Sequence, residues 1–386
     1  MKLTVEDVRS RFIKHFGGET GNVYASPGRI NLIGEHTDYN NGFVFPGAVT
    51  QGIIAEVKPN GSRTVDAYSI DLKDRAQFSL DDEKGPSATW ARYIFGVCRE
   101  MMALGVPVEG FNTAFAGDVP LGAGMSSSAA LESTYAMAIN DLWADNKIDR
   151  MEMARVGQRT EHKYVGVNCG IMDQAISCLG KKGALLRLDC RSGEYEYFPW
   201  NPKGYQLVLV NSCVKHELVG SPYNERRLQC EHVAEVIGKI HPEVKSLRDA
   251  TYEMLDEVKD QITETEYNRA HYVIGEVVRV LNVCDALQKD DYETVGKMMY
   301  ETHYGLSKEY EVSCEELDFL NDVAKEAGVT GSRIMGGGFG GCTINLIADE
   351  LVDNFKKVVT EKFFAQYGKK PIIIDVVIGD GARKLC

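Results

Sequence analysis

The sequence has no apolar run that approaches the roughly 18 residues of a membrane-spanning helix, so we expect no transmembrane segment. Residues 1–16 carry charges of both signs, unlike the apolar centre of a secretory signal peptide. Positive charge is also scarce, because 43 Lys and Arg stand against 56 Asp and Glu and give a net charge of −13. Nucleic acids and anionic membranes both require a basic surface, and we therefore expect neither as a partner.

The cysteines show no metal-binding or disulfide pattern. There are 10 of them, scattered without a C-x-x-C pair and without a Cys/His cluster at zinc spacing. This favours reduced thiols, most of them small core residues, in a cytoplasmic protein. The sequence also lacks a repeat of fixed period, which makes a solenoid or propeller an unsuitable interpretation.

The sequence does contain the composition of a folded protein, with 386 residues of which 44% are apolar and 26% charged. Helical and strand-like patterns alternate irregularly, which predicts an α+β or mixed α/β architecture, and the length suggests two domains or one large one. A polar, proline-bearing stretch at 191–203 separates two short apolar runs. We place the boundary there and expect an N-terminal domain over 1–200 and a C-terminal domain over 201–386.

Periodicity and helix-capping residues locate the main elements. We expect strands at 23–26, 52–57, 184–189, 205–211, 342–347 and 371–379. We expect helices at 90–104, 126–142, 149–164, 223–240, 268–288, 315–327 and 352–367. In the second of these, Leu131, Tyr135, Ala138 and Leu142 form the buried stripe of an amphipathic helix.

The first segment that could carry chemistry is Ser26-Pro-Gly-Arg-Ile-Asn-Leu-Ile-Gly-Glu-His-Thr-Asp-Tyr39. A strand is expected to end at its Pro-Gly pair, and Arg29, Glu35, His36 and Asp38 follow closely. Such groups beside glycines suit a polyol, because carboxylates accept hydrogen bonds from hydroxyls. A polar surface turn, or part of a metal site, would explain the same residues.

The second segment is Gly117-Asp-Val-Pro-Leu-Gly-Ala-Gly-Met-Ser-Ser-Ser-Ala-Ala-Leu-Glu132. Two glycines and three serines precede the start of a predicted helix, where unpaired backbone N–H groups would face one point. This arrangement suits the phosphates of a nucleotide. It is not a Walker A loop, since G-x-x-x-x-G-K-[ST] is absent from the chain. The alternative is an ordinary loop with a serine cap.

Two further segments are weaker. Asp173 lies in Asn168-Cys-Gly-Ile-Met-Asp-Gln174 and would by itself be read as a helix cap, as Glu161 would be read as a solvated helix residue. The glycines between Gly336 and Gly341 satisfy G-x-G-x-x-G, but a strand-like run follows them where a dinucleotide fingerprint needs a helix. We therefore reject a Rossmann site there, and with it a dinucleotide oxidoreductase.

Together these segments resemble the galactokinase branch of the GHMP small-molecule kinases, over nearly the whole chain. The run from Pro27 to Tyr39 is similar to the galactokinase signature, Leu121-Gly-Ala-Gly-Met-Ser-Ser-Ser-Ala-Ala130 to the phosphate loop, and Gly336-Gly-Gly-Phe-Gly-Gly341 to the third family motif. Val219-Gly-Ser-Pro-Tyr-Asn-Glu-Arg-Arg227 and Ser246-Leu-Arg-Asp249 add to it. The resemblance implies a two-domain GHMP kinase fold with its active site in the interdomain cleft.

The resemblance also implies a reaction, the transfer of the γ-phosphoryl group of Mg-ATP to the C1 hydroxyl of α-D-galactose. Asp173 would be the catalytic base and Arg29 the stabiliser of the transition state. Substrate would be bound by Glu35, His36, Thr37, Asp38, Gly170 and Tyr223. The nucleotide would be bound by Ser69, Trp90, Tyr93, Gly122, Ala123, Gly124, Met125, Ser126, Ser127 and Ser128, and Mg²⁺ by Ser128 and Glu161.

Two alternatives remain within this resemblance. One is a kinase for a related sugar such as N-acetylgalactosamine, galacturonate or arabinose. The other is a non-catalytic sensor of galactose and ATP, which the intact serines of Ser126-Ser-Ser-Ala-Ala130 disfavour. The expected partners are galactose and ATP, with no nucleic acid and no membrane, and the expected state is a monomer.

Overall fold

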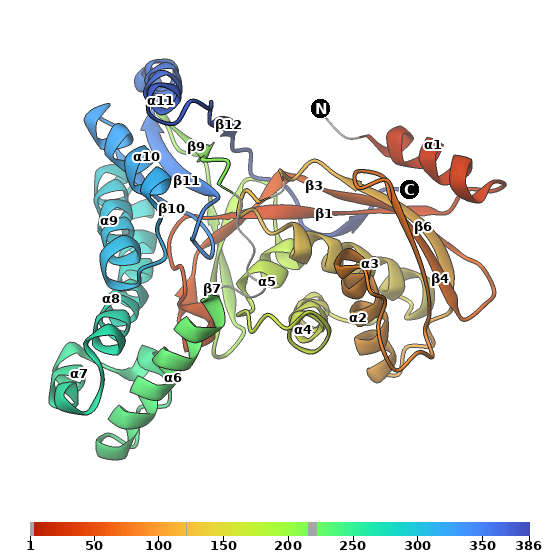
Figure 1. Cartoon of the computed structure of the whole chain (residues 1–386), viewed down its shortest axis with the longest axis horizontal. Coiled ribbons are helices and arrows are strands. Elements are labelled where there is room, and N and C mark those ends of the chain that lie inside the picture. The colour runs from red at the N-terminus through yellow and green to blue at the C-terminus, as the bar shows by residue number, and fades with distance from the viewer. Residues whose placement is uncertain (1–3, 121, 215–221) are drawn as a thin grey trace.

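The structure is a computed structural model that describes residues 4–120, 122–214 and 222–386 (Figure 1). Its α-helices are α1 Val5–Phe16, α2 Thr89–Ala103, α3 Ser127–Trp143, α4 Arg150–Thr160, α5 Met172–Leu179, α6 Tyr223–Ile240, α7 Tyr252–Glu257, α8 Glu264–Leu287, α9 Tyr292–Tyr304, α10 Glu315–Glu326 and α11 Val352–Tyr367. Its strands are β1 Asn22–Asn31, β2 Phe43–Val44, β3 Pro46–Pro59, β4 Thr64–Ser69, β5 Asp74–Ser79, β6 Phe111–Gly117, β7 Ala184–Asp189, β8 Tyr195–Pro199, β9 Tyr205–Asn211, β10 Gly331–Ile334, β11 Cys342–Ala348, β12 Ile372–Asp375 and β13 Arg383–Lys384. This mixture of separate sheets and helices confirms the predicted α+β class.

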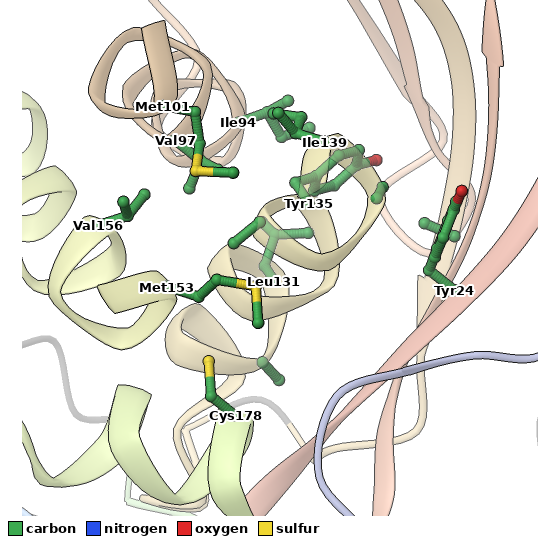
Figure 2. Close-up of a cluster of buried hydrophobic side chains, with 14 of the residues drawn as sticks. Tyr24, Ile94, Val97, Met101, Leu131, Tyr135, Ile139, Met153, Val156 and Cys178 are labelled. Atoms are coloured by element: carbon green, nitrogen blue, oxygen red, sulfur yellow. The ribbon is translucent and has the colours of Figure 1, made fainter. Parts of the chain in front are cut away.

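A six-stranded sheet of order β13-β1-β3-β6-β4-β5 organises the first half of the chain. Helices α2 to α5 cover one face of this sheet, and α1 packs on the other (Figure 1). Figure 2 shows the core between the helices and β1, where Leu131 and Tyr135 of α3 lie among apolar side chains of α2 and α4. The predicted stripe of α3 is confirmed, because Leu131, Tyr135 and Ala138 are buried and Leu142 packs against the same cluster.

A four-stranded sheet of order β10-β11-β9-β12 organises the second half. Successive residues of β9 point to opposite faces. Leu207 and Leu209 pack with side chains of α8 and α9, whereas Val208 and Val210 pack with α10 and α11. A three-stranded sheet, β2-β7-β8, contains the stretch 195–199, and at the end of the chain β13 returns to pair with β1. One hydrophobic cluster joins the two halves, because Ile30 of β1 and Met125 lie in the same cluster as Leu209 of β9.

Most predicted elements are found within a few residues of their expected bounds, but one expectation about β1 is wrong. The strand does not end at Pro27-Gly28 and continues to Asn31, with a shift of register against β3 between Pro27 and Arg29. Such a bulge accommodates the proline, which has no N–H to donate. A Cβ on Gly28 would lie 2.6 Å from the carbonyl oxygen of Met125, so glycine allows the strand to touch the serine-rich loop.

Two other sequence interpretations can be judged from the backbone. The glycine run 336–341 connects β10 to β11, which are antiparallel neighbours, so the rejection of a Rossmann turn is confirmed. The predicted helix at 149–164 begins after its Asp149 cap, but α4 ends at Thr160 and a π-helical turn, η2 (Glu161–Val165), follows. The ten cysteines carry free thiols, as expected.

Candidate active site

A cavity of about 500 Å³ brings the four sequence segments together. Most of the residues singled out from the sequence line it: Arg29, Glu35, His36, Asp38, Tyr93, Gly122, Ala123, Gly124, Met125, Ser126, Ser127, Ser128, Glu161, Gly170, Asp173 and Tyr223. Gly336 and Gly337, from the turn between β10 and β11, close it from the second half of the chain. The cavity therefore lies where elements of both halves meet.

An ion pair between Arg29 and Asp173 lies at the centre of this cavity. Arg29 extends from β1 and is nearly buried, and Asp173 lies in the first turn of α5. Arg29 Nε donates to Asp173 Oδ1 and NH2 donates to Oδ2, each over 2.8 Å. Such a two-pronged pair fixes the carboxylate in orientation as well as position. Arg29 also donates to the carbonyl of Gly124, and the Ser126 hydroxyl donates to Asp173 Oδ2.

The loop after β1 presents three polar side chains to the cavity because it turns sharply at Gly34, which has φ of +98°. A Cβ there would lie 2.8 Å from the Phe43 carbonyl oxygen, so this turn requires glycine. The next residue, Glu35, is held by a 2.8 Å hydrogen bond from the Gly336 N–H. The His36 ring lies 5.6 Å from that of Tyr223, at the start of α6.

Asp38 faces the backbone of Gly170 at close range. A Cβ on Gly170 would lie 1.9 Å from Asp38 Oδ2, so a side chain at 170 would displace the carboxylate. Burial and the nearby charge of Asp173 raise the pKa of Asp38 to about 6. A buried carboxylate with an elevated pKa in a cavity is a good acceptor for hydroxyl groups once it is ionised.

The serine-rich loop lines the cavity, and Ser126, at the N-cap position of α3, does not cap that helix with its side chain. Gly122, Gly124 and Ser126 all have positive φ, and the Ser126 side chain makes no capping hydrogen bond to α3. The first N–H groups of a helix have no partner within it. Those at the start of α3 face the cavity through Ser127 and Ser128, so they can bind an anion.

Two buried carboxylates, Glu161 and Glu132, lie near the end of α4. Burial and the charge of Asp173 raise the pKa of Glu161 to about 7, against the opposing effect of a hydrogen bond from Ser128. Burial raises the pKa of Glu132 well above its usual value. Glu161 Oε2 is buried without a hydrogen-bond partner among the described residues. An unpartnered carboxylate oxygen beside a serine hydroxyl fits Mg²⁺, which prefers oxygen ligands and takes others from phosphates and water.

Three residues that the resemblance implied lie outside the lining of this cavity, as far as the described residues show. Thr37 is buried and its hydroxyl donates to the carbonyls of Gly34 and Phe43 at 2.9 and 2.6 Å, which supports the loop. Trp90 donates from Nε1 to Asp74 Oδ2 over 2.9 Å, one turn before Tyr93 on α2. Ser69 is buried at the end of β4.

Other residues of the site were missed by sequence reasoning. Thr89, Arg92 and Gln174 line the cavity, and Arg333 bonds Glu35 from β10. Arg92 precedes Tyr93 and Gln174 follows Asp173 in the sequence, so their position beside predicted site residues could have indicated them. The part of the Val219-to-Arg227 segment that precedes Pro222 lies outside the described residues.

Comparison with known proteins agrees with this geometry. The family description "Galactokinase galactose-binding signature" matches residues 10–59, "GHMP kinases N terminal domain" matches 92–181, and "GHMP kinases C terminal" matches 284–365. The galactokinase of Clostridium acetobutylicum is 39% identical over 386 residues, which cover 98% of each chain.

Solved structures give the same result. The crystal structure of Lactococcus lactis galactokinase complexed with galactose superposes with a TM-score of 0.92, at 33% identity and 98% coverage of both chains. A mevalonate kinase from Methanococcus jannaschii superposes with a TM-score of 0.62 at 18% identity, covering 94% of this chain and 99% of that one, and shares the fold.

The fold and the matches to both GHMP kinase domains define a GHMP kinase, the class of ATP-dependent kinases for small molecules. Within that class, the full-length similarity and the galactose-binding signature show that the chain belongs to the galactokinase family. Its function is therefore that of an ATP-dependent sugar kinase. The described residues include no helix long and apolar enough to cross a membrane.

Proposed function

We propose that the cavity transfers the γ-phosphoryl group of Mg-ATP to the C1 hydroxyl of α-D-galactose, with Asp173 as the base and Arg29 as the stabilising cation. One observation carries the assignment. The Arg29–Asp173 pair lies between the polar loop after β1 and the serine-rich loop before α3, so a sugar on one side and a triphosphate on the other would meet at it. Phosphoryl transfer needs this positioning and charge neutralisation above all.

The roles divide between the two sides of the pair. Glu35, His36, Asp38, Gly170 and Tyr223 would hold the sugar. The N–H groups at the start of α3 would hold the phosphates. Asp173 would accept the proton of the C1 hydroxyl, and Arg29 would balance the charge that shifts to the leaving phosphate oxygen. The adenine would lie near Tyr93, with Trp90 and Ser69 behind it.

Ser128 and Glu161 would bind Mg²⁺. When bound, the ion would neutralise charge on the β- and γ-phosphates. Thr37 supports the sugar loop in this proposal and does not contact the sugar, because both of its hydroxyl contacts are to backbone carbonyls of its own loop.

The test is ADP release by the purified chain with Mg-ATP and a panel of sugars that includes galactose, N-acetylgalactosamine, galacturonate, arabinose and glucose. We expect galactose to be the preferred substrate and the product to carry its phosphate at C1. Preference for another sugar of the panel would replace galactose in this proposal. Binding of galactose and ATP without turnover would favour the sensor, although the complete Ser126–Ala130 run argues against it. We also propose that the chain divides into an N-terminal domain, residues 1–200, and a C-terminal domain, residues 201–386, and that the protein is a monomer.

A further inference from the structure

A second cavity, of about 430 Å³, lies behind the backbone that carries Gly170. We refer to it as the rear cavity. It shares Asp38, Cys169 and Gly170 with the active-site cavity, but no residue of the serine-rich loop lines it, as far as that loop is described. Its other walls come from α4, from η2, from the end of β7 and residues 190–193 after it, and from α6, and the lining also includes Tyr39, Asn41 and Ile171. The reaction proposed above does not use it.

The lining of the rear cavity is strongly basic. Four arginines and one histidine line it, against a single carboxylate, that of Asp38: Arg155, Arg159, His162, Arg191 and Arg227. The whole chain carries a net charge of −13, so this concentration of cations differs from the surrounding protein. A cavity with this lining attracts small anions.

Each of the four arginines already has an acidic partner outside the lining. The partners are Glu152 for Arg155, Glu100 and Glu152 for Arg159, Asp249 for Arg191, and Glu231 for Arg227. A guanidinium has five N–H donors, however. Arg155 uses NH1 for Glu152 and Arg191 uses NH2 for Asp249 and Ser246, which leaves donors at both side chains for another oxyanion. We therefore expect a modest affinity that depends on several arginines at once.

We propose that the rear cavity binds a small phosphate-bearing anion and that its occupancy weakens the binding of galactose. Phosphate is favoured over a monocarboxylate because clustered guanidinium groups match its several oxygens and its higher charge. The volume is sufficient for free phosphate or a small phosphomonoester. The second part of the proposal rests on the sugar site proposed above.

The coupling would act through the backbone between the two cavities. Arg227 NH1 donates to the Asn168 carbonyl over 3.2 Å, and His162 Nε2 donates to the Cys169 carbonyl over 2.8 Å. These carbonyls directly precede Gly170, which packs against the Asp38 carboxylate. An anion that binds Arg227 and His162 withdraws their donors from the loop. Without these hydrogen bonds the backbone at Gly170 shifts, and the Asp38 carboxylate that packs against it moves out of the position in which it would bind the sugar.

The test measures galactose affinity by calorimetry with the phosphate loop already filled by magnesium and a non-hydrolysable ATP analogue. Inorganic phosphate or glycerol phosphate is then added at constant ionic strength. We expect the Kd for galactose to rise about fivefold or more, the lower end of typical coupling between sites. In Arg155→Gln/Arg191→Gln this response should disappear. These two side chains do not touch the loop, so turnover in phosphate-free buffer should match that of the parent.

The matched control is Arg63→Gln/Arg187→Gln. It also removes two partly exposed arginines from ion pairs, Arg63 from Asp81 and Arg187 from Glu196. It should respond to phosphate as the parent does. An unchanged or tightened galactose Kd in the parent overturns the proposal, as does an equal response in the Arg155→Gln/Arg191→Gln variant. The stronger of the two probes identifies the source as free phosphate or a phosphomonoester. Failure of the proposed function would be seen separately, as absence of galactose phosphorylation by the parent.

Discussion

Arg333 NH1 donates to Glu35 Oε1 over 3.0 Å, and both side chains are almost completely buried. Arg333 also donates to the carbonyls of Asn31 and Leu32, so this single residue of β10 fixes the loop that follows β1. The loop proposed to bind the sugar is therefore positioned by the second half of the chain. A hydrogen bond of 2.8 Å from the Gly34 N–H to buried Glu276 of α8 has the same effect.

Substitution of Arg333 by Met should destabilise the protein strongly. Glu35 would remain buried without its partner, which typically costs about 3–5 kcal/mol. Urea unfolding followed by circular dichroism gives the free energy of unfolding. In Arg333→Met/Glu35→Met both charges are absent, so the part of this loss that comes from the unpaired Glu35 carboxylate should be recovered, whereas the carbonyls of Asn31 and Leu32 still lack their donor. Equal stability of the single variant and the parent would show that Arg333 is not a structural requirement of the loop.

Asp173→Asn should lower kcat by about 10²–10⁴, the usual effect of removing a general base. The amide keeps the shape of the carboxylate but cannot take the proton. The affinity for nucleotide should be retained, and this is measured by calorimetry with ATP. A variant that turns over at nearly the parent rate would return Asp173 to the role of a helix residue that anchors Arg29.

Ser128→Ala and Glu161→Ala should each raise the Mg²⁺ concentration required for half-maximal rate. Both changes remove an oxygen from the place where a carboxylate oxygen lies buried without a partner. The measurement is initial rate against Mg²⁺ at saturating ATP and galactose. If both variants keep the parent's Mg²⁺ dependence, the ion is held elsewhere.

Galactose affinity should fall as the pH is lowered through about 6. At pH 7.5 Asp38 is ionised and accepts hydrogen bonds from hydroxyls, whereas below its pKa of about 6 the protonated form predominates. If only the ionised form binds the sugar, the Kd rises by about tenfold for each pH unit well below that value. Calorimetry between pH 5 and 8 measures this, and Asp38→Asn should bind weakly with no such slope. A slope that persists in Asp38→Asn would assign the titration to another group.

Most residues singled out from the sequence line one cavity, and they could be singled out because they lie in short segments with distinctive chemistry. Glycines, serines and carboxylates at close spacing indicated ligand-binding loops, and the structure brings them to one cavity. Arg333 could not be recognised in this way, since its partner lies 298 residues away and an isolated arginine has no periodicity. The hydrogen bond between Ser126 and Asp173 was missed for the same reason, because serine before a helix is more often a cap.

The regular elements show a similar limit. The helices α6 and α11 match their expected bounds, although neither begins with a side-chain cap. In contrast, α1 was not expected, although Thr4 and Asp7 form a capping box at its start and its apolar residues Val8 and Phe12 are buried. The strand β1 was predicted too short, since a bulge that carries Pro27 through a sheet depends on the partner strand.

Gly170→Ala should abolish most galactose binding while leaving nucleotide binding intact. The added methyl group would lie 1.9 Å from Asp38 Oδ2, which is far inside van der Waals contact, so the carboxylate must move away from the sugar. We expect a loss of about 10- to 150-fold in kcat/KM for galactose, the equivalent of one hydrogen bond to a charged group at about 1.5–3 kcal/mol. Gly238→Ala in α6 is the control, because a Cβ there lies 3.1 Å from its nearest atom, the Val244 carbonyl oxygen, a tight contact that a small shift relieves. If Gly170→Ala lowers affinity for ATP and galactose by equal factors, the substitution disturbs the whole cavity, and Gly170 does not act through Asp38.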